Sequence, residues 1–374
     1  MLLVSRTSLG VVVVCCVSMS PSFEGGGEVH QKELIRQADH AISQEQLLVA
    51  ARLLRQLSSD AQSSSSSSLL TKEHHTVLKK ATITENVIST HLKPPVLDAG
   101  WKKQTEVHGN RDTIIYYKVD DDDCSKLTCR IETPIEASLL VPLMAVFNES
   151  ELYETWMPRF NVWPAAKVGV RESKKLQDQP ARGAQVVQVT VDMPRPFISD
   201  REVVFESYAV DDIDAQGLIF LKGTSLEVGD HYYHHDDKDE SLHVPPPLPG
   251  IKRLDFECGW VIRRCPDDHP ALRKSKHKYP AKEHLLLLSL TQYVNAYVDW
   301  VPQWLINFFT RTALSGQWKS LLQVATDVKE GKRPDHAECI RNKQELYGWV
   351  NGRIQAMFDK LDNYSDNNKE NGNA

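Results

Sequence analysis

Long apolar runs are missing from this sequence of 374 residues. The longest lies around residues 9–17, whereas a helix that spans a bilayer needs ~20 such residues. We therefore do not expect an integral membrane protein. Residues 1–22 do contain a basic residue, a short apolar stretch and small residues after it, the outline of a secretory signal without a convincing cleavage site. We interpret them as a possible signal or a disordered N-terminus.

An excess of basic residues is also missing. The chain has 44 Lys and Arg against 50 Asp and Glu, with a formal net charge of -6. Acidic and basic residues are interspersed, whereas a surface that binds nucleic-acid phosphates needs a concentrated basic stripe. The sequence therefore argues against a nucleic-acid partner.

Cysteine is scarce, with seven residues in the chain. If Cys15 and Cys16 left with a signal, an odd and scattered set of five would remain. This pattern indicates reduced thiols and a cytoplasmic protein, although the apolar N-terminus leaves secretion open. Cys258 and Cys265 are seven residues apart in an expected strand, which would place them on opposite faces and over ~20 Å apart. We predict that both pack in the core without forming a disulfide.

The usual catalytic motifs are absent. The chain has no Gly-x-Ser-x-Gly elbow, no His-Glu-x-x-His, no Walker loop and no Rossmann glycine pattern. The run HYYHHDD at residues 231–237 does carry imidazole and carboxylate groups that can bind zinc or nickel, but adjacent ligands on one loop rarely converge. We favour a hydrated loop there, and we predict no catalytic residue, no metal and no cofactor.

The N-terminal part has helical periodicity. Apolar residues recur at three and four positions over residues 29–57, with a break at Ser43 and Gln44, and again over residues 71–92. Serines 63–68 form a flexible linker between these segments. We interpret residues 29–92 as a helical extension with a Ser-rich linker, which could also dock a protein partner.

From Trp101 onward the apolar period changes to two, which is typical of strands. One long apolar helix is predicted at residues 302–329, and residues 331–374 are predicted to be a helical and disordered tail. This order indicates an α+β grip, in which a long helix packs on a curved antiparallel sheet. The remaining predicted elements are a hairpin at 114–119 and 127–132, helices at 137–147 and 151–156, and strands at 165–172, 184–193, 202–210, 217–227, 252–263 and 284–298.

The final helix carries more apolar surface than one sheet contact can cover. Trp304, Phe308 and Phe309 lie within six residues and point to more than one side of the helix. An apolar stripe on a helix usually faces a sheet, but this excess suggests that part of it lines a ligand cavity or meets a membrane.

Three segments together with Trp156 resemble the START family of steroidogenic-acute-regulatory-related lipid transfer domains. They read VTVDMPRPFISDREVV at residues 189–204, CGWVI at 258–262 and VPQWLINFFTR at 301–311. The resemblance covers about residues 100–330, and the order of the segments agrees with the predicted strands and helices. It departs from the family pattern at Cys258, where a small residue is expected, and in the longer loop at 229–250.

The resemblance implies a helix-grip fold, in which a curved antiparallel sheet surrounds an apolar tunnel that the long C-terminal helix closes. Arg201 would then lie near the tunnel wall and either bind a lipid phosphate or carboxylate, or form a structural salt bridge with Glu202 or another acid. The residues that the resemblance implies for lipid contact are Arg201, Trp156, Phe197, Ile198, Trp260, Trp304, Phe308 and Phe309.

The function that the resemblance implies is the binding of a single lipid, such as a phospholipid or a sterol, which is transferred or sensed at membranes through peripheral contact. Two alternatives remain open from the sequence. One is a helix-grip enzyme that acts on a hydrophobic substrate, and the other is a lipid-regulated adaptor that uses the N-terminal helices.

Overall fold

The structure is a computed structural model. It describes residues 26–60, 69–108, 112–120, 122–123, 125–163, 166–178, 184–195, 198–228, 231–232, 242–272, 284–297, 308 and 312–371.

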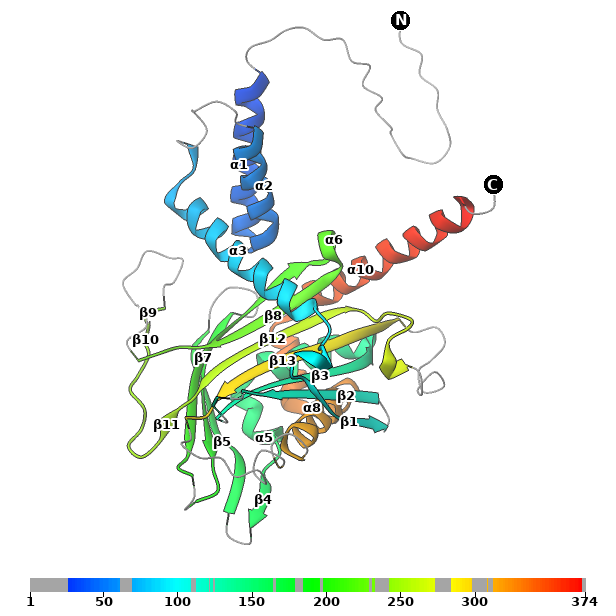
Figure 1. Cartoon of the computed structure of the whole chain (residues 1–374). Coiled ribbons are helices and arrows are strands. Elements are labelled where there is room, and N and C mark those ends of the chain that lie inside the picture. The colour runs from blue at the N-terminus through cyan, green and yellow to red at the C-terminus, as the bar shows by residue number, and fades with distance from the viewer. Residues whose placement is uncertain are drawn as a thin grey trace, which may run out of the picture.

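One curved 11-stranded sheet forms the centre of the molecule (Figure 1). The strand order is β1-β2-β3-β13-β12-β8-β7-β6-β5-β4, and these neighbours pair antiparallel. A short strand, β11, pairs in parallel with β7, and β9 and β10 form a separate pair. The strands are β1 Lys102–His108, β2 Asp112–Val119, β3 Lys126–Glu136, β4 Phe160–Trp163, β5 Ala166–Asp178, β6 Gln185–Asp192, β7 Arg201–Asp212, β8 Leu218–Ser225, β9 His231–Tyr232, β10 Leu242–His243, β11 Lys252–Arg253, β12 Asp255–Arg264 and β13 Leu285–Asn295.

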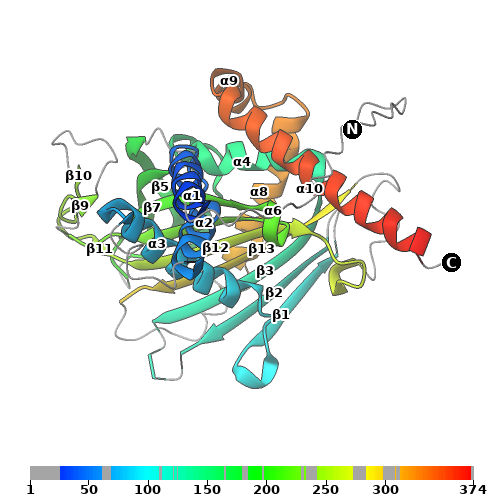
Figure 2. The same ribbon diagram turned by 90° about the horizontal axis from the view of Figure 1, so that it is seen from above.

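Helices from both ends of the chain cover the two faces of this sheet (Figure 2). The inner face packs against α4, α5, α8 and α10, and α9 packs on α4, α8 and α10. The outer face carries α2 and α3, with α1 packed on α2. The short α6 joins β7 to β8. The helices are α1 Gly26–Ser43, α2 Leu47–Asp60, α3 Lys72–Leu92, α4 Leu140–Asn148, α5 Tyr153–Trp156, α6 Ile213–Gln216, α8 Leu314–Lys329, α9 Pro334–Asn342 and α10 Gln344–Asn371.

The N-terminal helices are docked on the sheet by an apolar layer of their own. Leu48 of α2 and Ile88 of α3 are buried with Phe220 of β8 and Val261 of β12. The guanidinium of Arg130 on β3 donates to the carbonyls that end α3, at 2.7 Å from His91 O and 2.8 Å from Lys93 O. The apolar faces of α2 and α3 are therefore used within the chain.

Strand β12 shows why both faces of the sheet must be covered. Its side chains alternate, so that Cys258 and Trp260 face the inner core while Val261 faces α2 and α3. Gly259 lies between them on the outer face, where an added Cβ would come within 2.5 Å of the His91 ring. The glycine thus allows α3 to approach the sheet closely.

The fold class is confirmed: the chain is an α+β helix-grip fold with a curved antiparallel sheet, C-terminal helices on its inner face and a helical N-terminal extension. The hairpin and the other predicted strands and helices appear close to their predicted positions. The predicted strand at 252–263 is divided, because β11 pairs with β7 before the chain crosses to join β12 to β8. The final helix is described as α8 from Leu314, and of its predicted first half only Phe308, Thr312 and Ala313 are described.

The segment predicted to be a tail contributes to the core. Tyr347, Val350 and Ile354 of α10 are buried in the main core cluster, with Met357 and Phe358 one turn further. At least the first half of α10 therefore belongs to the body of the fold. Its apolar residues recur at three and four positions, but that pattern does not specify which surface they cover.

Two further observations concern the cysteines and the membrane. The thiols of Cys129, Cys258, Cys265 and Cys339 are free. Among the described residues, none of the helices has the length and apolar character that a bilayer crossing requires.

We predict that Gly259→Ala weakens the docking of α3. The new methyl group would overlap the His91 ring, and overpacking of this kind costs about 1–3 kcal/mol of the free energy of unfolding. Urea denaturation of the full chain measures the loss. Gly348→Ala on α10 is the matched control, because a Cβ there meets nothing within 4 Å. The steric account fails if adding His91→Ala to Gly259→Ala recovers no stability.

Candidate functional site

A cavity of about 450 Å³ lies between the inner face of the sheet and the helices that cover it. This volume is in the range of sites that enclose small molecules. Its wall is largely apolar, because alternate residues of several strands point into it together with side chains of α4, α8 and α10. These residues include Val203 and Phe205 of β7, Phe256, Cys258 and Trp260 of β12, Leu290 and Val294 of β13, Phe147 of α4, Leu314, Trp318 and Leu321 of α8, and Leu346, Trp349 and Val350 of α10.

Cys258 fits this wall because of the residue beside it. Gly223 of β8 is its partner in the sheet, and a Cβ on Gly223 would lie only 2.8 Å from the Cys258 sulfur. The glycine makes room for a thiol at the position where the family pattern leads us to expect a smaller residue.

Arg201 is a buried cation at one end of the cavity, with 3% of its surface exposed. Its Nε donates to Ala296 O at 2.9 Å, and its Nη1 donates to the carbonyl and hydroxyl oxygens of Ser199 at 2.6 and 2.7 Å. Burial lowers the pKa of this guanidinium, although the nearby charge of Asp200 opposes the shift. None of its described hydrogen-bond partners is a carboxylate.

The alternative salt bridge between Arg201 and Glu202 is not formed. Glu202 is fully buried and instead accepts from Arg253 at 2.5 Å and from Gln188 at 2.7 Å. Neighbouring residues in a strand point to opposite faces, so Arg201 and Glu202 cannot easily meet. Sequence adjacency suggested this pair, and strand geometry excludes it.

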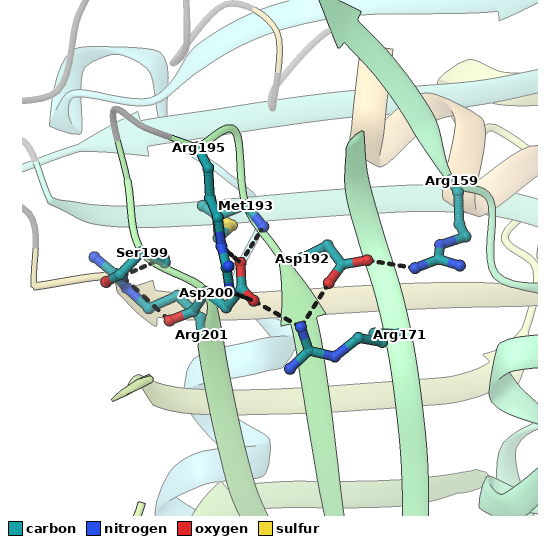
Figure 3. Close-up of polar contacts among 8 residues, drawn as sticks. All are labelled: Arg159, Arg171, Asp192, Met193, Arg195, Ser199, Asp200 and Arg201. Carbon is teal, nitrogen blue, oxygen red and sulfur yellow. Dashed lines mark hydrogen bonds and ion pairs between the residues drawn. The ribbon is translucent and has the colours of Figure 1, made fainter. Parts of the chain in front are cut away.

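An arginine-aspartate network holds the loop between β6 and β7 (Figure 3). Buried Asp200 accepts from Met193 N at 3.2 Å and from Arg171 at 2.6 Å, and also from Arg195. Arg171 lies between Asp200 and Asp192 and donates to Asp192 at 2.9 Å. Burial alone would raise the pKa of Asp200, but the hydrogen bonds from Arg195, Arg171 and Met193 N hold it below its usual range. This loop is therefore fixed at its base by a charged carboxylate.

Aromatic side chains form another part of the cavity wall. Trp260 stacks on Trp318 of α8, with ring centroids 5.5 Å apart, and its other neighbour is Phe147 of α4 at 4.1 Å. The indole N–H of Trp318 donates to Thr133 of β3 at 2.7 Å. The stack joins two helices to the sheet, so α8 is held firmly along this part of its length.

Four of the residues predicted for lipid contact line the cavity, namely Arg201, Trp156, Ile198 and Trp260. Phe308 packs against Met193 and Ile198, and its ring lies 5.8 Å from that of Phe160 in an edge-on arrangement. The other three predicted residues, Phe197, Trp304 and Phe309, lie outside the described residues.

Several polar groups in the described wall have structural partners. Gln185 accepts from Ser150 at 3.1 Å, Ser125 donates to Asn295 at 2.8 Å, and Asp211 accepts from Arg353. Burial raises the pKa of the lining thiols of Cys129 and Cys258 to about 12, so both are protonated at neutral pH and are poor nucleophiles.

Clusters of three or more potential metal-ligating side chains are absent from the described residues. Most of the histidine-rich run at 231–237, for which we favour a hydrated loop, lies outside them.

Comparison with known proteins gives weak similarities only. No protein-family model and no curated protein sequence matches the chain. Among solved structures, human STARD10 matches over 66% of this chain and 80% of that one, with 14% identity and a TM-score of 0.43. Human StAR-related lipid transfer protein 5 matches over 66% and 94%, with 16% identity and a TM-score of 0.43. The lipid transfer and protein localization domain of human StarD13 (DLC2) matches over 66% and 95%, with 13% identity and a TM-score of 0.35. Similarity this low does not assign a function, so the cavity itself must indicate one.

We predict that Asp200→Asn lowers the free energy of unfolding by about 2–3 kcal/mol at neutral pH, because charge-assisted hydrogen bonds to the loop are weakened. The pKa of Asp200 is depressed in the folded protein, so its stabilisation is present above its ordinary pKa of 3.8 and is lost as the pH falls through the folded value. Urea titrations from neutral to acidic pH measure this. A difference in the free energy of unfolding between wild type and variant that is as large below pH ~3 as at neutral pH would contradict the assignment. Asp98→Asn, at an exposed residue, is the control.

Proposed function

We propose that the protein binds a single lipid in this cavity and transfers or senses it at membranes. The observation that carries the proposal is the combination of a largely apolar cavity wall with a buried cation, Arg201, at one end. An apolar cavity alone would suit many hydrophobic molecules. The cation adds a place for one anionic group, so the site is suited to an amphipathic ligand.

The energetics favour such a ligand on both counts. Enclosing a hydrocarbon chain recovers ~0.8 kcal/mol for each methylene removed from water, so a long chain can compete with its place in a bilayer. Among the described residues, the Arg201 guanidinium bonds only to neutral oxygens, which is costly for a buried cation, and a ligand phosphate or carboxylate beside it would offset part of that cost.

The end of the cavity near Arg201 also suits contact with a membrane. At this end, Met193 and Ile198 of the β6–β7 loop pack with Phe308. In the network at the base of the β6–β7 loop, arginines outnumber carboxylates, which favours the negative surface of a membrane that contains anionic lipids. The groups concerned are Arg159, Arg171, Arg195 and Arg201 on one side, and Asp192 and Asp200 on the other. Asp123 and Asp255 lie on the other side of this end, beside Ser125 and Tyr297. We therefore propose that the protein meets membranes peripherally at this end.

Neither alternative is favoured by a specific observation. For an enzyme, the described cavity wall would have to place a nucleophile beside a base, and Gln185, Ser125 and Asp211 are instead tied to structural partners. For an adaptor, the N-terminal helices would need a free apolar face, and the described faces of α2 and α3 are packed on the sheet. The free buried thiols agree with a reducing compartment, so we propose a cytoplasmic location.

We predict that Arg201→Gln selectively weakens the extraction of anionic lipid. Charge-assisted hydrogen bonds contribute about 1.5–3 kcal/mol, so transfer of labelled phosphatidic acid from vesicles should fall about tenfold or more. Transfer of a neutral diacylglycerol should change much less. The matched control is Arg55→Gln, which removes an arginine from the outer helices, where Arg55 pairs with Glu85. If wild-type protein extracts neither of these lipids and also binds no sterol and no single-chain lipid, the proposed function is wrong. If Arg201→Gln reduces the transfer of both lipids equally, Arg201 does not bind the anionic headgroup.

A further inference from the structure

The last helix of the chain forms a wall of the cavity. Leu346, Trp349 and Val350 of α10 lie on one face of the helix, at spacings of three and four residues, and all three line the cavity. This wall lies beyond residues 100–330, the segment that resembles the START family, so neither the resemblance nor a sequence motif indicates it.

This wall is at the opposite end of the cavity from Arg201. Arg353 of α10 pairs with Asp211, which lies ten positions after Arg201 on β7. Ten strand residues correspond to roughly 33 Å. The neighbouring strand β6 also places α10 away from Arg201. Its residue Gln185 lies opposite Ser207 of β7 and accepts from Ser150, and Glu149 beside Ser150 bonds to Tyr347 of α10.

Charged contacts fix α10 in place. Arg353 donates to Asp211 at 2.5 Å and to Asp214 of α6 at 2.8 Å. Glu149, at the end of α4, accepts from the Tyr347 hydroxyl at 2.6 Å and from the Lys343 ammonium at 2.9 Å. Burial would raise the pKa of Glu149, but the bonds from Tyr347, Lys343 and Asn148 hold it below its usual range. The helix is therefore a fixed end wall.

The shape of the cavity restricts what can reach this wall. A volume of about 450 Å³ spread over the length between Arg201 and α10 makes a narrow passage. An extended hydrocarbon chain fits such a passage better than a compact ring system does. The buried cation is at one end. At the other end Leu346, Trp349 and Val350 present apolar side chains, and the polar groups Asp211 and Gln185 are paired with Arg353 and Ser150.

We infer that the ligand is a long-chain lipid with an anionic headgroup, which lies with its head at Arg201 and the end of its chain against Leu346 and Trp349. These two side chains then select the chain length. A shorter chain leaves a void and loses about fourfold in affinity per missing methylene. A longer chain must displace a wall that is held on two sides. This inference rests on the proposed function and deepens it by naming the ligand class and its orientation.

The test compares binding of two probe series, fatty acids and lysophosphatidic acids, each of increasing chain length, to the full chain. The two series carry a carboxylate and a phosphate, so they also distinguish the two headgroups. Trp349→Ala deepens the cavity and should move the tightest-binding chain length upward by about two methylenes or more. Leu346→Trp shortens the cavity and should move the optimum downward. Met357→Ala is the matched control, because it trims a buried α10 side chain that does not line the cavity, and its optimum should equal that of wild type.

The two proposals fail in different ways. If wild type binds either series but neither Trp349→Ala nor Leu346→Trp moves the optimum, the orientation is wrong and lipid binding stands. If wild type binds sterols or neutral lipids but neither series, the ligand class is wrong and lipid binding again stands. If wild type binds no lipid at all, the proposed function is overturned and this inference with it. The two variants shift the optimum in opposite directions, so loss of folding in one still leaves the other as a test.

Discussion

The middle of the sheet is apolar on both faces, and the other layers of the molecule follow from that constraint. On β12, Cys258 and Trp260 point inward while Val261 points outward, and on β8 the outward residue Phe220 is fully buried. Neither face can be left to water, since large exposed apolar patches are costly. The N-terminal helices α2 and α3 cover the outer face over β7, β8 and β12, and Gly259 lets α3 come close. The C-terminal helices cover the inner face without filling it, and the space that remains is the cavity.

The cavity has a chemical direction because Arg201 at one end has no carboxylate among its described hydrogen-bond partners, whereas Asp211 at the other end is paired with Arg353. The described hydrogen-bond partners of Arg201 are carbonyl and hydroxyl oxygens, while the nearby carboxylates of Asp200 and Glu202 are occupied by other cations. The same loop that carries Ser199 is fixed by the Asp200 network, so the geometry around the guanidinium is set independently of any ligand. At the far end α10 offers mainly apolar side chains. A molecule with one anionic end and one long apolar end matches this arrangement.

Local patterns in the sequence predict much of this architecture. Period-two runs indicate the strands, and helical spacing indicates α1 to α3 and α8. The resemblance to START domains predicts Arg201 near the tunnel wall and Trp156, Ile198 and Trp260 as lipid-contact residues, and all four line the cavity. The rest depends on contacts between distant segments. The amphipathic pattern of α10 shows that one face is buried, but only the fold shows that this face closes the cavity. The fit of Cys258 against Gly223 depends on strand register, and the partner of Glu202 is Arg253, 51 residues away. Sequence adjacency predicts neither.

Native mass spectrometry of the full chain purified from cells, followed by extraction and identification of any bound lipid, tests the central claim most directly. The intact chain is needed because α3 and α10 both belong to the packed body. The account predicts one lipid per folded chain, with an anionic headgroup and a long hydrocarbon chain. A folded protein that stays empty after incubation with vesicles of mixed lipids would contradict it.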